Sequence, residues 1–250
     1  MSIVVCAATG SEHSACLRGI RDAKLSSDFE VLRTGMGFEN AGRVLREYLK
    51  TSARPSLIVS SGFAGGFSPI LTRNSWVTAD TVLLAGNEAI DKSYRAVPLA
   101  GIADVVSCTM VSSAELVIGA GGSGGSNGAD KAQQYLALPQ PVAVDMESAV
   151  LAQVAVERGI PIMIFRMITD TPAEPLPDFL APLTGAIISQ GARIRAALAF
   201  KGLAAAVRDT RGIARLVKDG SSWPKLLRRG WSQNAAVIRE IGLNEIVRKS

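Results

Sequence analysis

The stretch PVAVDMESAVLAQVAVERGIPIMIFRMITDT, residues 141–171, decides the fold. Two apolar runs within it, residues 142–144 and 160–167, have the composition of buried strands. Residues 147–158 between them are helical in pattern. A strand, a helix and a strand with short connections form a crossover unit, whose ligands usually bind at the carboxyl ends of the strands. We therefore expect two parallel strands with a ligand site at their ends.

Acidic residues stand at both of those strand ends. Asp145 and Glu147 follow the first strand, and Asp170 follows the second. Carboxylates that enter one crevice from two strand ends can bind hydroxyl groups and transfer protons. The stretch therefore predicts a site for a hydroxylated ligand.

The rest of the chain continues the alternation of strands and helices. Further strands are predicted at residues 3–8, 29–33, 56–61, 76–84 and 103–110, and further helices at residues 11–23, 39–50 and near 129–136. Ser11 is the expected N-cap of the first helix, and Glu12 lies in its first turn. This alternation predicts an α/β layered sandwich.

Three glycine-rich segments interrupt the pattern. Residues 34–37 (TGMG) predict a tight turn, and residues 62–66 (GFAGG) predict a loop where backbone amides approach a ligand, with a plain turn as the alternative. Neither has the spacing of a dinucleotide fingerprint or a P-loop. Residues 119–128 (GAGGSGGSNG) predict a flexible surface loop, and a phosphate cradle is the alternative.

The composition bounds the class of protein. The chain has 250 residues, of which 48% are hydrophobic, 20% charged and 5% aromatic. This favours a compact domain and argues against stacking on single-stranded nucleic acid. Three cysteines without metal spacing predict reduced thiols in the cytoplasm, and a single histidine, His13, excludes a site with several imidazoles. No metal site is expected, and no signal peptide or membrane-spanning run is recognised.

The positive charge is concentrated in the tail. The net charge is +5, and residues 185–250 hold thirteen Lys/Arg against four Asp/Glu. We expect a catalytic domain at residues 1–184 and a basic helical extension at residues 185–250, packed on or beside it, with a break at residues 220–224. The extension is either a set of solvated surface helices or an attachment to anionic lipid or an acidic partner. Nucleic acid is not an expected partner.

Four motifs carry a resemblance to a known family. They are AVDMESAVLA (residues 143–152), FRMITDT (165–171), SSGFAGGFSP (60–69) and TGMGFENAG (34–42). In order and approximate spacing they resemble the nucleoside phosphorylase superfamily, which includes purine nucleoside phosphorylases and methylthioadenosine/S-adenosylhomocysteine nucleosidases. The resemblance covers about residues 1–180. It implies a three-layer α/β/α sandwich with a mixed central sheet, a homo-oligomer and an adenine nucleoside as the ligand.

The resemblance also implies roles for individual residues. Glu147 is similar to the ribose-binding glutamate, with Met146 packed against the sugar. Asp170 corresponds to the acid that serves purine N7, and Thr169 replaces a serine beside it. Glu12 falls where the nucleosidases keep the carboxylate that activates water.

Four further residues complete the implied site. Ala64 and Gly65 match the backbone segment near the sugar and the nucleophile. Phe63 takes the place of a serine that meets phosphate or water, and Leu116 or Val117 replaces the aromatic residue that stacks on the base.

The chemistry accounts for these residue types. Cleavage of an N-glycosidic bond develops positive charge on the ribose, which a carboxylate at the hydroxyl groups stabilises. Adenine leaves readily only when N7 is protonated, so Asp170 must hold a proton near neutral pH, as burial favours. An aspartate here, where 6-oxopurine enzymes often have asparagine, resembles the adenine-directed branch.

Departures from the family pattern shape the remaining expectations. Phe63 and the lack of an arginine in residues 57–61 favour hydrolysis assisted by Glu12, while phosphate stays open as a co-substrate; no cofactor is expected. The basic tail and the motif VDMES (residues 144–148) resemble those of the hopanoid-associated phosphorylases. This resemblance implies adenosylhopane as the substrate and peripheral membrane contact through the tail. The alternatives are a methylthioadenosine/S-adenosylhomocysteine nucleosidase and a non-catalytic nucleoside-binding protein.

Overall fold

The computed structural model describes residues 2–86, 90–99, 102, 104–114, 116, 134–139, 141–188 and 192–247. Its strands are β1 (Ile3–Ala7), β2 (Phe29–Arg33), β3 (Leu57–Gly66), β4 (Trp76–Ala85), β5 (Ile90–Arg95), β6 (Val105–Ser112), β7 (Val142–Asp145) and β8 (Ile162–Asp170). Its helices are α1 (Gly10–Asp22), α2 (Phe38–Thr51), α4 (Ser148–Glu157), α5 (Leu180–Ile188), α6 (Ala192–Arg208) and α7 (Thr210–Val247). In this described part, no helix is long and apolar enough to span a membrane.

The eight strands form one mixed sheet that closes on itself. Its order is β2-β1-β3-β7-β6-β4-β5, and β8 pairs with both β3 and β4. Strands β3, β7, β6, β4 and β8 therefore form a closed ring, with β1 and β2 extending from β3 and β5 from β4. The predicted mixed sheet is confirmed.

The predicted parallel crossover of β7 and β8 is wrong. The two strands are not paired with each other; β7 runs antiparallel to β3 and β8 runs parallel to it. Gly65 of β3 pairs with Val144 near the end of β7 and with Asp170 at the end of β8. The carboxyl ends of all three strands therefore still meet, because β7 approaches β3 from the opposite direction and overlaps only its last residues.

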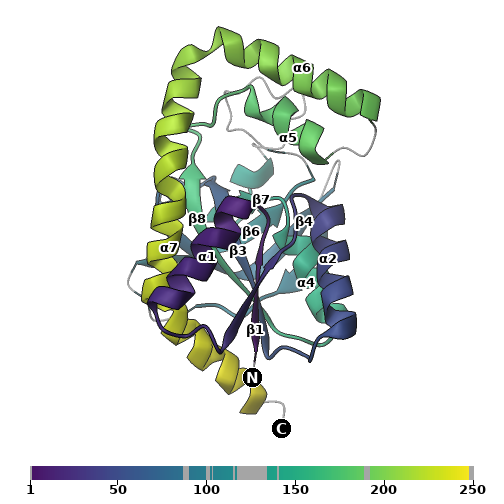
Figure 1. Ribbon diagram of the computed structural model, residues 1–250, viewed down its shortest axis with the longest axis vertical. Coiled ribbons are helices and arrows are strands. Elements are labelled where there is room, and N and C mark those ends of the chain that lie inside the picture. Colours follow the sequence, from purple (N-terminus) through teal and green to yellow (C-terminus); the bar gives the residue numbers. More distant parts are fainter. Residues whose placement is uncertain are drawn as a thin grey trace.

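Helices cover the sheet on two sides, as Figure 1 shows. Strand β1 illustrates the division, since its side chains alternate between the two faces. Val4 and Cys6 belong to a core shared with α2 and α4, whereas Ile3 and Val5 belong to a core shared with α1 and α7. The three-layer α/β/α sandwich is thus the architecture of the chain.

The C-terminal helix α7 forms much of one layer. Trp231 is fully buried and packs edge-on against Phe29 and Phe165. Gly19 of α1 allows a close crossing, because a Cβ there would lie 2.5 Å from Cβ of Trp231. The part of α7 around Trp231 therefore lies in the same core as β1. The division of the chain into two domains at residue 184 stays a prediction.

Several predicted boundaries are wrong. The helix α7 continues through residues 220–224 and includes Pro224. Side chains on both sides of the proline are engaged, since Asp219 pairs with Arg73 and Leu227 is buried. Residues 62–66 are the end of strand β3, not a loop. The N-cap of α1 is Thr9, not Ser11. The loop predicted at residues 119–128 and most of a helix near residues 129–136 lie outside the described residues.

Candidate active site

A cavity of about 190 Å³ lies where β3, β7 and β8 end. Its lining includes nine residues that the resemblance places in the site: Glu12, Phe63, Ala64, Gly65, Leu116, Met146, Glu147, Thr169 and Asp170. The lining is completed by Ala8, Thr9, Met36, Val144, Asp145, Arg166, Leu176 and Trp223. The structure thus brings the predicted residues together, while their individual roles stay predictions. Val117, the other candidate for the base-stacking position, lies outside the described residues.

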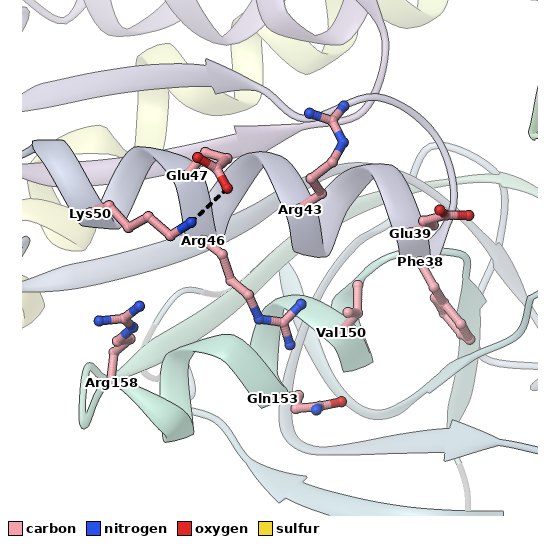
Figure 2. A pocket seen from close by; sticks show the side chains of 9 residues that line it. All are labelled: Phe38, Glu39, Arg43, Arg46, Glu47, Lys50, Val150, Gln153 and Arg158. Atoms are coloured by element: carbon pink, nitrogen blue, oxygen red, sulfur yellow. Dashed lines mark hydrogen bonds and ion pairs between the residues drawn. The ribbon is translucent and has the colours of Figure 1, made fainter.

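A larger hollow of about 610 Å³ lies elsewhere, between α2 and α4. Figure 2 shows it lined by long charged side chains, with Lys50 paired to Glu47. Arg46 pairs with Glu157, and both side chains of each pair are exposed to solvent. Such a groove holds no desolvated acid or base, so the smaller cavity is the better candidate for chemistry.

Arg166 of β8 organises one wall of the cavity, although the sequence analysis did not single it out. It is buried, with Nε 2.7 Å from Asp145 Oδ2 and Nη2 3.5 Å from Glu147 Oε2. The guanidinium also donates to the Phe63 carbonyl oxygen at 3.0 Å and to the Ser60 hydroxyl at 2.9 Å. Arg166 is therefore engaged by protein groups on several sides and serves as a counter-charge.

Asp145 has a structural role. Besides its ion pair with Arg166, it accepts hydrogen bonds from the Ser112 hydroxyl and from the Ser148 amide at the start of α4. The carboxylate thereby joins β6, β7, β8 and α4. Asp145 fixes the segment that carries Glu147.

Glu147 is held in place from both sides. Its Oε1 accepts a hydrogen bond of 3.0 Å from the Gly37 amide, and its Oε2 faces Arg166. Gly37 has a φ of +82°, a conformation that glycine adopts without strain. Burial raises the pKa of Glu147 to about 7; the Arg166 charge opposes this and the Asp145 charge adds to it. Glu147 is thus a fixed carboxyl group that changes charge near neutral pH.

Asp170 is placed by an irregularity in the sheet. Ala64 of β3 pairs with Ile168 and Gly65 pairs with Asp170, so Thr169 is an extra residue on β8. A Cβ on Gly65 would lie 3.0 Å from Asp170 Oδ2, which shows why a glycine stands there. Burial raises the pKa of Asp170 to about 6, against a hydrogen bond from the Thr169 hydroxyl (2.9 Å) and the charge of Arg73.

Glu12 reaches the cavity from the first turn of α1. Its Oε2 accepts hydrogen bonds from the Thr9 amide (2.8 Å) and hydroxyl (2.7 Å). The Glu12 amide in turn donates to Thr9 Oγ1 (3.3 Å), which completes a capping box with the Thr9 amide bond. Its Oε1 accepts one of 3.0 Å from the Phe63 amide. A Cβ on Gly62 would lie 2.2 Å from that oxygen, so only glycine allows this approach. The cap of α1 therefore also orients a carboxylate at the cavity.

The helix α7 supplies a wall that the sequence analysis missed. Trp223 lines the cavity and its ring centroid lies 5.9 Å from that of Phe63. Arg73 lies 6.0 Å from the Trp223 ring and bonds to Thr169 O (2.9 Å) and to Asp219 Oδ2 (2.6 Å). It joins β8 to α7 beside the cavity. No local motif marks Trp223, because its place depends on how a distant helix packs.

The charge of the cavity is predominantly negative. Among the described lining residues, Glu12, Asp145, Glu147 and Asp170 provide four carboxyl groups, and Arg166 provides the cation. No group of three or more His, Cys, Asp or Glu side chains that could hold a metal ion is present in the described residues. The arrangement can donate a proton from Asp170, accept one at a fixed carboxylate, and stabilise positive charge on a bound molecule.

Comparisons with known proteins agree with this geometry. A family model described as the Phosphorylase superfamily matches residues 29–199. No curated protein sequence matches the chain.

Solved structures resemble the fold at low sequence identity. The 5′-methylthioadenosine/S-adenosylhomocysteine nucleosidase of Helicobacter pylori, bound to butyl-thio-DADMe-Immucillin-A, has 13% identity and a TM-score of 0.62, and the match covers 96% of this chain and 98% of that chain. The same type of enzyme from Neisseria meningitidis, bound to methylthio-immucillin-A, has 17% identity and a TM-score of 0.54, over 83% and 99%. A futalosine hydrolase mutant of Helicobacter pylori has 15% identity and a TM-score of 0.54, over 81% and 98%.

Proposed function

Because the chain belongs to the Phosphorylase superfamily, we propose that it cleaves the N-glycosidic bond of an adenine nucleoside, with water as the nucleophile. The observation that carries this proposal is the meeting of Asp170, Glu147 and Glu12 in one cavity. One of them, Asp170, is a buried acid whose pKa is raised to about 6.

Each carboxyl group has a separate task in the proposed reaction. Asp170 donates its proton to N7 of adenine as the bond between C1′ and N9 breaks. Glu147 binds the ribose hydroxyl groups and stabilises the positive charge that develops on the sugar. Glu12 accepts a proton from the water whose oxygen bonds to C1′. The products are adenine and a ribose with a free hydroxyl group at C1′.

The charge of the cavity favours water over phosphate. A phosphate ion would meet four carboxyl groups, and Arg166 is already engaged by Asp145, Glu147, Phe63 and Ser60. Phosphorolysis needs a cationic or amide-rich cradle for the anion. Hydrolysis therefore fits the described residues better.

Two candidate substrates differ in the group attached at the 5′ position of the nucleoside. Met36, Leu176 and Trp223 give the cavity apolar walls, which suit an apolar group on the nucleoside. A thioether, as in methylthioadenosine, is one such group. The lipid chain of adenosylhopane is the other, and it follows from the resemblance of the tail to the hopanoid-associated phosphorylases.

The test is a substrate panel. The protein is incubated with adenosine, inosine, methylthioadenosine, S-adenosylhomocysteine and a lipid-linked adenosine, each with and without phosphate, and the free base and sugar products are measured. We expect adenine release, no hypoxanthine from inosine, and free sugar in both conditions. Asp170→Asn and Glu147→Gln should each lower the rate of release by about 10²-fold or more, whereas Asp80→Asn, a change at an exposed aspartate of β4, should not.

Two outcomes contradict the proposal. A sugar 1-phosphate that forms only with phosphate would make the enzyme a phosphorylase. Tight binding of an adenine nucleoside by calorimetry, with no adenine released over hours, would make it a nucleoside-binding protein, as Phe63 in place of a serine would allow.

The setting of the enzyme is part of the proposal. Cys6, Cys16 and Cys108 are buried and unpaired, which suits the reducing cytoplasm. We propose a homo-oligomer on the strength of the resemblance alone. Light scattering coupled to size-exclusion chromatography measures the mass of the particle and tests it.

A further inference from the structure

One face of helix α6 is apolar and exposed. Phe200, Leu203 and Val207 are 76%, 62% and 71% exposed. Their spacing of three and four residues places them on the same side of the helix. We call these three side chains the α6 stripe. Large apolar side chains grouped in this way mark an interaction surface.

The α6 stripe is separate from the face by which α6 joins the protein. Gly202 and Ala206 are buried on the other side of the helix. A Cβ on Gly202 would lie 2.6 Å from Cγ of Leu183, so α6 packs closely on α5 there. This contact fixes the rotation of α6 and leaves the stripe turned toward solvent.

Positive charge borders the stripe, and negative charge is absent from this part of the sequence. Residues 179–208 contain no aspartate or glutamate. Lys201 and Arg208 are exposed, and at 100° per residue both lie along one edge of the stripe. A surface that combines apolar and cationic side chains is complementary to an anionic lipid interface. A second copy of the chain would instead bring like charges together.

The stripe lies at the same end of the molecule as the cavity. Figure 1 shows α5 and α6 at the end opposite the N-terminus, beyond the carboxyl end of β1. Ile188 at the end of α5 packs on Gly37, since a Cβ there would lie 3.2 Å from Ile188 Cγ2. Gly37 in turn donates to Glu147. Helix α5, on which α6 packs, therefore contacts the glycine that holds Glu147 in the cavity.

We propose that the α6 stripe docks the protein on an anionic lipid bilayer. Phe200, Leu203 and Val207 enter the boundary between headgroups and acyl chains, and Lys201 and Arg208 contact the lipid phosphates. Docking turns the cavity end of the molecule toward the bilayer. This inference goes beyond the proposed reaction and does not depend on it.

Flotation with lipid vesicles tests the proposal. The full chain is mixed with vesicles of phosphatidylcholine, or of phosphatidylcholine with phosphatidylglycerol, and the bound fraction is measured. We expect binding to the anionic vesicles and a loss of about tenfold or more in the double variant F200S/L203S, because each side chain buries a large apolar area. Lys201→Gln and Arg208→Gln should each weaken binding about fivefold.

A matched control separates the stripe from apolar exposure in general. Val156 of α4 is 59% exposed and lies on another helix, so Val156→Ser should bind vesicles like the unmodified chain. Circular dichroism and thermal unfolding establish that each variant is folded.

Three outcomes would overturn the proposal. The first is no binding of the full chain to anionic vesicles. The second is unchanged binding by F200S/L203S. The third is a smaller particle by light scattering in F200S/L203S together with no vesicle binding by the unmodified chain, which would assign the stripe to a second copy. Release of adenine from a water-soluble nucleoside is measured separately, so failure of docking and failure of the proposed reaction are distinguishable.

Discussion

At the scale of single residues, the cavity is a set of carboxyl groups in different surroundings. Asp170 lies against Gly65 and Thr169 and has no ion-pair partner among the described residues, although the charge of Arg73 acts on it. Glu147, in contrast, shares Arg166 with Asp145. Burial raises the pKa of both groups, to about 6 for Asp170 and about 7 for Glu147. The protonated form of Asp170 and the ionised form of Glu147 are the ones that the reaction needs, so their titrations act in opposite directions.

This opposition predicts a bell-shaped dependence of kcat/KM on pH. The productive form of the enzyme has Glu147 ionised and Asp170 protonated. Its fraction falls toward low pH, where Glu147 (pKa about 7) gains a proton, and toward high pH, where Asp170 (pKa about 6) loses one. The rate is therefore greatest between these two pKa values. Asp170→Asn should lower the rate by about 10²–10⁴-fold and remove the limb on which the rate falls with rising pH. Glu147→Gln should remove the other limb. An unchanged profile in Asp170→Asn would reject Asp170 as the acid.

A second prediction at this scale concerns stability. Arg166→Met should lower the free energy of unfolding by about 3–5 kcal/mol, because Asp145 and Glu147 would remain buried without their counter-charge. Arg46→Met is the control, since Arg46 pairs with Glu157 at the surface and such pairs contribute about 0–1 kcal/mol. Urea denaturation measures both. Equal effects would show that the buried ion pair has no special weight.

At the scale of elements, strand β3 does most to arrange the site. The Phe63 carbonyl oxygen accepts a hydrogen bond from Arg166, and the Phe63 amide donates one to Glu12. Gly65 lies beside the Asp170 carboxyl group. The sequence predicted a loop at residues 62–66 because glycine is rare in strand interiors. Here the glycines are strand residues whose missing side chains make room for carboxylates.

This reading predicts the effect of a single methyl group. Gly62→Ala places a Cβ 2.2 Å from Glu12 Oε1 at a φ of +143°, so Glu12 must move away from the Phe63 amide. We expect a large loss of adenine release with the fold retained, measured by steady-state kinetics and circular dichroism. Gly220→Ala is the matched control, because nothing lies within 4 Å of the added methyl group and alanine favours the helix by up to about 1 kcal/mol. Full activity in Gly62→Ala would show that Glu12 is not required.

At the scale of the whole molecule, the sequence predicted the layers better than the connections. Apolar periodicity predicted most of the strands and helices. The resemblance named nine residues that line one cavity in the structure. Apolar periodicity did not predict β5, because its sequence IDKSYR is mostly polar and exposed. It also missed the closed ring of strands, because pairing partners such as Gly65 and Val144 are set by tertiary packing. Trp223 and Arg166 escaped notice for the same reason.

The position of α7 gives a prediction at this scale. Trp231→Ala should lower the free energy of unfolding by about 3–5 kcal/mol, since its ring is fully buried and also donates a hydrogen bond of 2.9 Å to Ser61. Removal of residues 210–250 should expose the apolar surface of α1, β1 and β8 that α7 covers, and yield insoluble protein. Expression of the shortened chain, with solubility and circular dichroism as readouts, checks this. A soluble, folded product would show that the tail is a separable extension.

The burial of Trp231 against the first strands also bears on how the protein is made. Ribosomes release the N-terminal end first, so β1 and β2 emerge long before the segment that covers one of their faces. Gly242 of that last helix packs on Ile3 near the start of the chain. The nascent polypeptide therefore carries an open apolar surface until α7 has left the ribosome. Any stalled or prematurely terminated product would expose that surface to chaperones and proteases, which gives the cell a means of removing incomplete copies.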